Sequence, residues 1–76
     1  MQQPTPGTYQ HYKGNLYEVL DTVVHSETLE ELVLYKPLYA TEYQFNGRLW
    51  VRPLAMFMET VVVNGTEVKR FEPVQL

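Results

Sequence analysis

The sequence predicts an all-β domain whose strands form an antiparallel barrel or sandwich. Short apolar runs recur along its 76 residues, and Gly–Asn or Asn–Gly pairs lie between several of them. Closing the sheet would protect its edge strands from pairing with other chains. A chain of this length forms one domain with a small core, so we expect a shallow groove and not a deep active-site cavity.

Composition limits the classes of function. Cysteine is absent, which excludes disulfides, thiol catalysis and Cys-ligated zinc. The net charge of −3 disfavours a general nucleic-acid binder, so duplex DNA is not an expected partner. No apolar run approaches the ~20 residues of a membrane helix, and residues 1–7 do not resemble a signal peptide. We therefore expect a cytoplasmic protein without membrane association and without a cofactor.

The N-terminal part predicts a flexible arm followed by a β-hairpin. Residues 1–7 contain two prolines and no periodic pattern, which is typical of a loosely attached arm. Thr8–Lys13 and Leu16–Val24 are the predicted strands, because Thr, Tyr and Val are common in both. Gly14 begins the two-residue connection between them, and glycine at this position suits a type II′ turn.

The register of this hairpin decides which side chains face the core. A two-residue turn pairs Tyr12 with Tyr17 and His11 with Glu18. We expect the tyrosine pair to face the core and His11 to face the solvent. Asp21 interrupts the apolar pattern of the second strand, which predicts a β-bulge or a sheet edge near this position.

A third strand is expected after a polar loop. Leu32–Tyr35 is an apolar run typical of a strand covered on much of both faces, and Pro37 should end its pairing or place it at an edge. A helix that begins at Thr28 is the alternative, because Thr28 and Glu31 have the spacing of a capping box. The β-branched and aromatic residues that follow, together with Pro37, would keep such a helix short.

A fourth strand and a helical turn are expected next. The Asn46–Gly47 pair is a strong turn signal, and Arg48–Pro53 follows it as a strand in which Trp50 and Arg52 share one face. Residues 53–58 lack strand alternation. They predict a single helical turn that starts after the proline and closes one end of the core.

The last hairpin is predicted from its turn. An Asn64–Gly65 turn of type I′ requires a positive φ at the glycine. It pairs Val61 with Val68 and brings Glu59 opposite Arg70.

The polar stretch His25–Thr28 is the candidate functional site. It places an imidazole, two hydroxyls and a carboxylate on a loop between two strands, where functional residues are often found. The same side chains can instead satisfy the loop backbone, which is the main alternative. A hydrolytic triad is disfavoured because Ser26 and His25 are adjacent and point to opposite faces. A zinc site would need Glu30 or Glu31 as a further ligand.

Arg52 is the arginine inside an apolar strand, and a half-buried guanidinium needs an acceptor nearby. We expect Glu27 to be ionised and paired with it, while Ser26 and Thr28 hydrogen-bond the loop backbone. An Arg52 without such a partner would instead favour an anionic ligand, with Trp50 as an aromatic wall.

The motifs in combination resemble one family. They are Tyr12-Lys13-Gly14-Asn15-Leu16-Tyr17-Glu18-Val19-Leu20, His25-Ser26-Glu27-Thr28, Leu32-Val33-Leu34-Tyr35, Leu49-Trp50-Val51-Arg52-Pro53-Leu54, Met56-Phe57 and Arg70-Phe71. Over about Gly7 to Phe71 the chain is similar to a small bacterial domain known as domain of unknown function 1653. The resemblance implies an SH3-like β barrel and supplies no activity. Its pattern contains His25, Ser26, Glu27, Thr28, Tyr35, Trp50, Arg52 and Pro53.

We therefore predict a small SH3-like antiparallel barrel of five or six strands with one short helical turn. It spans residues 8–71, between the arm of residues 1–7 and a tail of residues 72–76. The predicted function is a non-catalytic binding module of the bacterial cytoplasm for a small anionic ligand or a peptide. The alternatives are a small hydrolase or metal-assisted enzyme that uses His25 and Glu27, and an accessory domain that binds RNA or protein. The candidate ligand-binding residues are His25, Ser26, Glu27, Thr28, Tyr35, Trp50 and Arg52.

Overall fold

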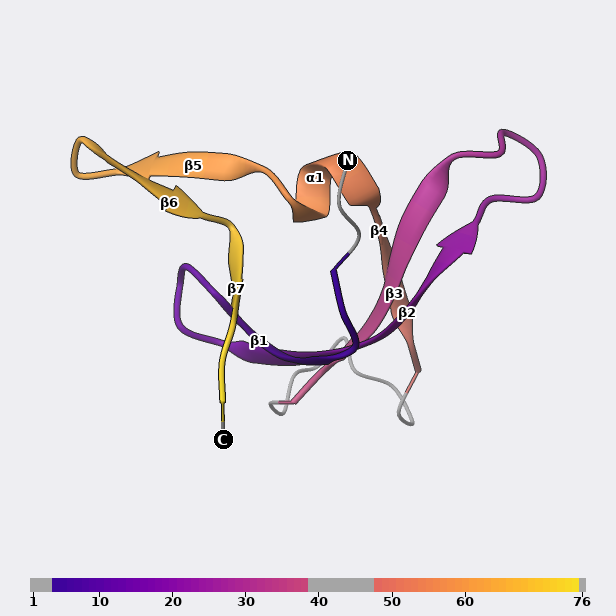
Figure 1. The fold of residues 1–76 in the computed structure, drawn as a ribbon, viewed down its shortest axis with the longest axis horizontal. Helices are drawn as coiled ribbons and strands as arrows, with labels where there is room; N and C mark the ends of the chain where they lie inside the picture. Colours follow the sequence, from indigo (N-terminus) through magenta and orange to yellow (C-terminus); the bar gives the residue numbers. More distant parts are fainter. Residues whose placement is uncertain (1–3, 39–47, 76) are drawn as a thin grey trace.

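The computed structural model describes residues 4–38 and 48–75. Within these ranges the elements in order are β1 (Gly7–His11), β2 (Leu16–Val24), β3 (Glu31–Pro37), β4 (Trp50–Pro53), α1 (Leu54–Phe57), β5 (Thr60–Val63), β6 (Thr66–Lys69) and β7 (Phe71–Pro73). Five strands form one antiparallel sheet in the order β4-β3-β2-β1-β7, and β5 pairs with β6 in a separate hairpin (Figure 1). The all-β class and the helical turn are confirmed. In the described ranges no ladder joins β4 to β7, so closure of the barrel stays a prediction.

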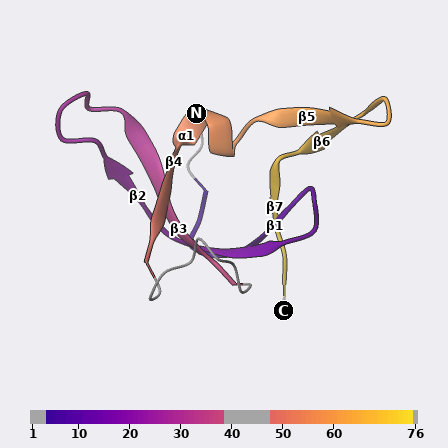
Figure 2. The same ribbon diagram turned by 180° about the vertical axis from the view of Figure 1, so that it is seen from behind.

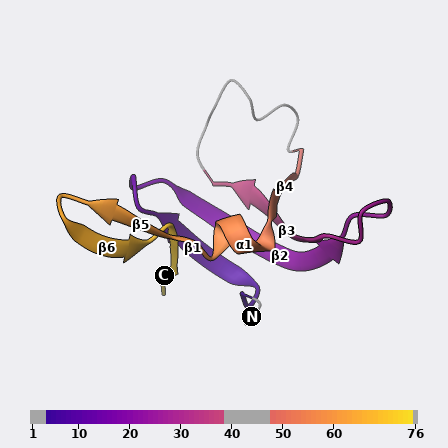
Figure 3. The same ribbon diagram turned by 90° about the horizontal axis from the view of Figure 1, so that it is seen from above.

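The five-stranded sheet is strongly curved. In Figure 1, β1 crosses its base while β7 rises on one side and β3 and β4 rise on the other, so that the sheet has a concave face. The short helix α1 lies over this face, as the views from behind and from above show (Figures 2 and 3). The hairpin of β5 and β6 and the loop between β2 and β3 project at opposite ends of the molecule (Figure 3).

The first hairpin does not have the predicted register. Tyr17 of β2 lies opposite Tyr9 and not opposite Tyr12. A longer loop replaces the two-residue turn, since the amide of His11 donates to the carbonyl of Asn15 at 2.8 Å. The difference of three positions is odd, so it exchanges the two faces of β1. His11, expected to face the solvent, is on the same face as the buried Tyr9.

The predicted irregularity of β2 is confirmed. The register between β2 and β3 shifts between Val19 and Asp21, which is the β-bulge expected where the apolar pattern breaks. The segment after the polar loop is strand β3 and not a helix, because its residues alternate between half-buried and buried positions. The buried ones are Val33, Tyr35 and Pro37.

The helical turn begins after Pro53, as predicted. Pro53 fits the start of α1 because the missing amide is not needed there. The turn buries Leu54 and Phe57 against the concave face of the sheet. The Phe57 ring stacks on Phe71, with centroids 4.2 Å apart and an interplanar angle of 2°.

The predictions for the last hairpin are confirmed. Val61 lies opposite Val68, and Gly65 has a φ of +78°. Glu59 and Arg70 meet at the base of the hairpin, where the Arg70 amide donates to the Glu59 carbonyl at 2.9 Å and the two side chains form an ion pair.

Strand β7 extends into the segment expected to be a tail. Glu72 lies opposite Gln10 of β1, and Pro73 lies opposite Tyr9. The amide of Val74 also donates to the carbonyl of Thr8 at 3.0 Å. Glu72 and Pro73 therefore belong to the sheet.

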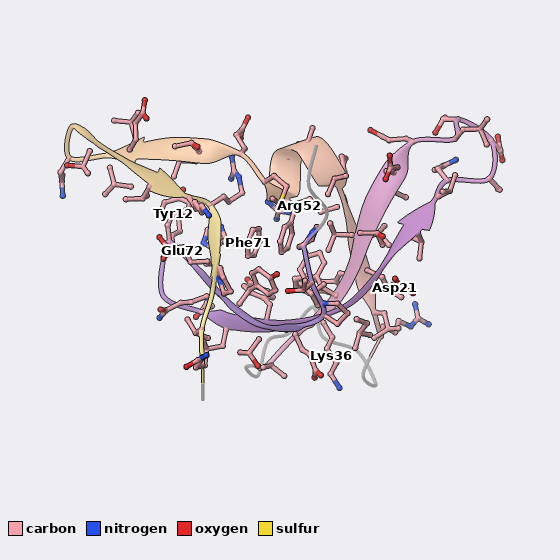
Figure 4. All side chains as sticks on the ribbon, viewed as in Figure 1. Tyr12, Asp21, Lys36, Arg52, Phe71 and Glu72 are labelled. Atoms are coloured by element: carbon pink, nitrogen blue, oxygen red, sulfur yellow. The ribbon has the colours of Figure 1, made fainter. Side chains whose placement is uncertain are left out.

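The core lies on the concave face and is mostly aromatic. Its buried members are Tyr9, Tyr17, Val19, Val33, Tyr35, Leu54, Phe57 and Phe71, and Trp50 packs against them. Figure 4 shows Phe71 on the inner side of the curved sheet, whereas Lys36 and Asp21 point away from it. Edge-to-face ring contacts connect these side chains, for example between Tyr17 and Tyr35 at 5.5 Å.

Candidate functional site

The loop between β2 and β3 carries the polar stretch His25–Thr28. Two backbone hydrogen bonds close this loop, from the amide of His25 to the carbonyl of Glu30 and from the amide of Leu29 to the carbonyl of His25, both at 2.8 Å. Leu29 has a φ of +63°, which is unusual for a residue other than glycine. The loop is therefore a compact, closed turn, and its residues are exposed to solvent.

Two side chains of the loop satisfy its own backbone. The Nδ1 atom of His25 accepts hydrogen bonds from the amides of Glu27 at 3.1 Å and Thr28 at 3.3 Å. The hydroxyl of Thr28 accepts one from the amide of Glu30 at 3.2 Å, as predicted for this residue. The Nδ1 atom of His25 is thus occupied, and no hydrogen bond in the described ranges joins Ser26 to the His25 ring.

Arg52 lies at a second place, on the concave face. Its Nε donates to the hydroxyl of Tyr35 at 3.3 Å, and its guanidinium carbon is 5.3 Å from the centroid of the Phe71 ring. Figure 4 shows Arg52 above Phe71 and below α1. Arg52 belongs to one edge strand of the sheet and Phe71 to the other, so this cation–π contact crosses the concave face.

Tyr35 and Trp50 accompany Arg52. Tyr35 and Trp50 face each other across β3 and β4, with ring centroids 6.1 Å apart. Tyr35 is buried, whereas Trp50 is half-buried and also contacts Tyr17. Three of the predicted site residues, Tyr35, Trp50 and Arg52, are therefore brought together by the fold.

The predicted ion pair between Glu27 and Arg52 is absent, and that prediction is wrong. The ion pairs among the described residues are Lys36–Glu18 and Arg70–Glu59. Arg52 pairs with Val33, which in turn pairs with Thr22 of β2. Thr22 lies three residues before His25, so the loop begins about 10 Å further along the strand. Arg52 turns inward toward Phe71 instead of along the sheet toward the loop.

His11 lies beside these residues, a position that sequence reasoning missed. Its ring contacts Phe71 at 4.9 Å and Tyr17 at 6.3 Å, so it lies among the same aromatic residues as Arg52. Its Nδ1 accepts a hydrogen bond from the amide of Lys13 at 3.1 Å. The signal was hidden by the register of the first hairpin, because a two-residue turn places His11 on the opposite face.

The charges around His11 are positive. Burial lowers the pKa of His11 below its ordinary value of 6.5, and the charges of Arg52, Arg70 and Lys13 lower it further. Arg70 is paired with Glu59, and its Nε is buried without a hydrogen-bond partner among the described residues. The two guanidinium groups carry the positive charge of this region, and we call them, together with the imidazole of His11, the cationic cluster.

Two further findings concern the described residues only. They contain no group of three or more His, Asp or Glu side chains arranged to hold a metal ion. None of their helices has the length and apolar character needed to cross a membrane.

The comparisons with known proteins identify the family. The family model described as a protein of unknown function (DUF1653) matches residues 7–73. The chain is also similar to the crystal structure of a protein of that family from Bordetella bronchiseptica, with 36% sequence identity and a TM-score of 0.85 over 97% of this chain and 91% of that one. A search of curated proteins found no match. This chain therefore belongs to the DUF1653 family of uncharacterised proteins.

Proposed function

We propose that this domain is a non-catalytic binding module of the bacterial cytoplasm whose ligand presents a small anionic group to Arg52. The environment of Arg52 carries the proposal. The guanidinium is half-buried over Phe71, donates from Nε to Tyr35, and has no carboxylate partner among the described residues. A guanidinium with unused N–H donors suits a carboxylate or phosphate, which it binds through two parallel hydrogen bonds.

The charge distribution supports the same function. The whole chain has a net charge of −3, yet His11 and Arg52 both contact Phe71, and the charges of Arg52 and Arg70 act on His11. A local positive cluster in a negatively charged protein favours a small anion over duplex DNA, which requires a broad basic surface. Tyr35 and Trp50 supply the aromatic wall. A ligand that also contacts Ser26 or Thr28 has to extend about 10 Å along the sheet, as a peptide does.

The test is a titration followed by amide and arginine Nε–H NMR signals. Acetate, inorganic phosphate and a short peptide with a free C-terminal carboxylate serve as probes. We expect shifts at Arg52, Tyr35 and Phe71 for at least one probe, and about tenfold weaker binding for Arg52→Met, because one charged hydrogen-bonding group is lost.

Arg48→Met is the matched control, since Arg48 is exposed and lies before β4. It should bind like the wild type. Equal affinity of Arg52→Met and the wild type, or no binding of any probe, contradicts the proposal.

A further inference from the structure

His11 contacts Phe71 and also lines an open groove. The groove has a volume of about 340 Å³ and lies between the β1–β2 loop and the β5–β6 hairpin; His11, Tyr12, Val68, Lys69 and Glu72 are among its lining residues. Figure 4 shows Tyr12 and Glu72 at this end of the sheet, beside β7. A solute can therefore approach His11 from solvent through this groove.

The three cationic residues come from three different parts of the chain. His11 ends β1, Arg52 belongs to β4, and Arg70 connects β6 to β7. His11 and Arg52 both contact the ring of Phe71, at 4.9 Å and 5.3 Å. His11 and Arg52 thus lie against the same ring, and the charge of Arg70, the residue before Phe71, acts on His11.

We infer that a tetrahedral dianion of the phosphate type binds among His11, Arg52 and Arg70, with His11 protonated in the complex. The inference rests on the proposed function and names the class of its ligand. Donors that come from three parts of the chain match an anion with oxygen atoms on several sides, whereas a carboxylate holds its acceptors in one plane. Two negative charges also offset more of the repulsion among the three cations than one does.

Without a bound anion, the contacts of His11 favour the neutral ring. The amide of Lys13 donates to Nδ1, so the neutral ring carries its proton on Nε2. Arg52, Arg70 and Lys13 oppose a further positive charge on this ring. A bound dianion offsets these charges and raises the pKa of His11. The added proton enters at Nδ1 and displaces the hydrogen bond from the Lys13 amide, so binding takes up a proton and strengthens as the pH falls.

Two carboxylates also lie near His11. Glu72 lines the groove, and Glu59 is paired with Arg70. Both carboxylates repel an anion and so weaken its binding. Neither forms an ion pair with Arg52 in the described ranges.

Sulfate is the chosen probe because it keeps two negative charges across the pH range in which His11 titrates. Any pH dependence of its binding therefore comes from protonation of the protein and not of the ligand. The two histidine ring signals are followed by NMR against pH, with and without sulfate. We expect sulfate to raise the pKa of His11 and to leave the His25 signal unchanged, which makes His25 an internal control. Calorimetry should find about tenfold tighter binding near pH 5.5 than near pH 7.5.

The variant His11→Asn keeps an acceptor for the Lys13 amide and removes the titration. Its sulfate affinity should no longer depend on pH, whereas His25→Asn should bind like the wild type at every pH. Binding that depends on Arg52 but not on pH or on His11 overturns this inference and leaves the proposed function intact. Acetate binding as tight as that of sulfate also overturns it. The absence of binding by sulfate, phosphate, acetate and the carboxylate peptide overturns both.

Discussion

Each of the two histidines accepts, at Nδ1, a hydrogen bond from a backbone amide two residues further along the chain. His11 accepts from Lys13 and His25 accepts from Glu27. Imidazole nitrogen here takes the part that an Asp or Asn oxygen takes in an Asx turn. The two residues differ in their surroundings, because His25 is exposed on a loop and His11 lies among aromatic and cationic groups.

The exposed histidine should contribute to stability through its acceptor nitrogen. His25→Ala removes the acceptor for the amides of Glu27 and Thr28, and we expect a loss of about 0.5–1 kcal/mol in the free energy of unfolding. His25→Asn retains an acceptor, so its free energy of unfolding should decrease by only about 0.2–0.3 kcal/mol. Urea unfolding of both variants measures the difference. Equal losses for alanine and asparagine would show that the hydrogen bonds do not stabilise the loop.

The inward histidine should make stability depend on pH. The pKa of His11 is lower in the folded state than the ordinary value of 6.5, so the unfolded chain binds the proton more tightly. Its contribution is fully present above pH 6.5 and is lost as the pH falls through the folded-state pKa. We expect the urea concentration at the unfolding midpoint to decrease when the pH is lowered from about 7.5 to about 5.5. In His11→Asn this decrease should be smaller. A wild-type profile as flat as that of the variant would contradict the assignment.

At the scale of the elements, turn chemistry could be predicted where it depends on one residue. Asn64–Gly65 requires a positive φ, and the type I′ turn and its strand register follow from it. The two-residue turn predicted at Gly14 is not formed, because the loop that contains this glycine begins two positions earlier, at Tyr12. Hydrogen bonds from the backbone and ring of His11 close that loop. Turn length is set by such contacts, which a dipeptide pattern does not contain.

The β5–β6 hairpin offers a clean test of backbone strain. A Cβ at Gly65 would meet no atom of the described residues within 4 Å, so substitution there costs conformational energy alone. We expect Gly65→Val to destabilise the hairpin by about 1–2 kcal/mol, because its φ of +78° is unfavourable for a β-branched residue. Amide hydrogen exchange of Val61 and Val68 should accelerate. Unchanged exchange rates would contradict the proposed turn geometry.

At the scale of the whole molecule, the strands could be predicted better than the site. Strand order and curvature bring Arg52 of one edge strand over Phe71 of the other, residues that are far apart in the sequence. The alternation in β4 correctly placed Trp50 and Arg52 on one face, but it could not show which acceptor Arg52 meets. The aromatic ring and the Tyr35 hydroxyl take the place expected for the Glu27 carboxylate.

The separation of the loop from the cationic cluster predicts additive effects. Glu27 and Arg52 form no ion pair or hydrogen bond in the described ranges. The losses of Glu27→Gln and Arg52→Met should therefore sum in the double variant to within about 0.3–0.5 kcal/mol. Thermal or urea unfolding of the three variants measures the coupling. A coupling energy above about 1 kcal/mol would contradict the separation of the two regions.

The most direct test of the anion site is a crystal structure of the protein with selenate, a tetrahedral dianion that can be located by the anomalous scattering of selenium. We predict one anomalous peak on the concave face, within hydrogen-bond distance of the Arg52 guanidinium and His11 Nε2, which is lost in crystals of Arg52→Met. Selenate bound only at exposed lysines, with Arg52 and His11 unoccupied, would contradict the account.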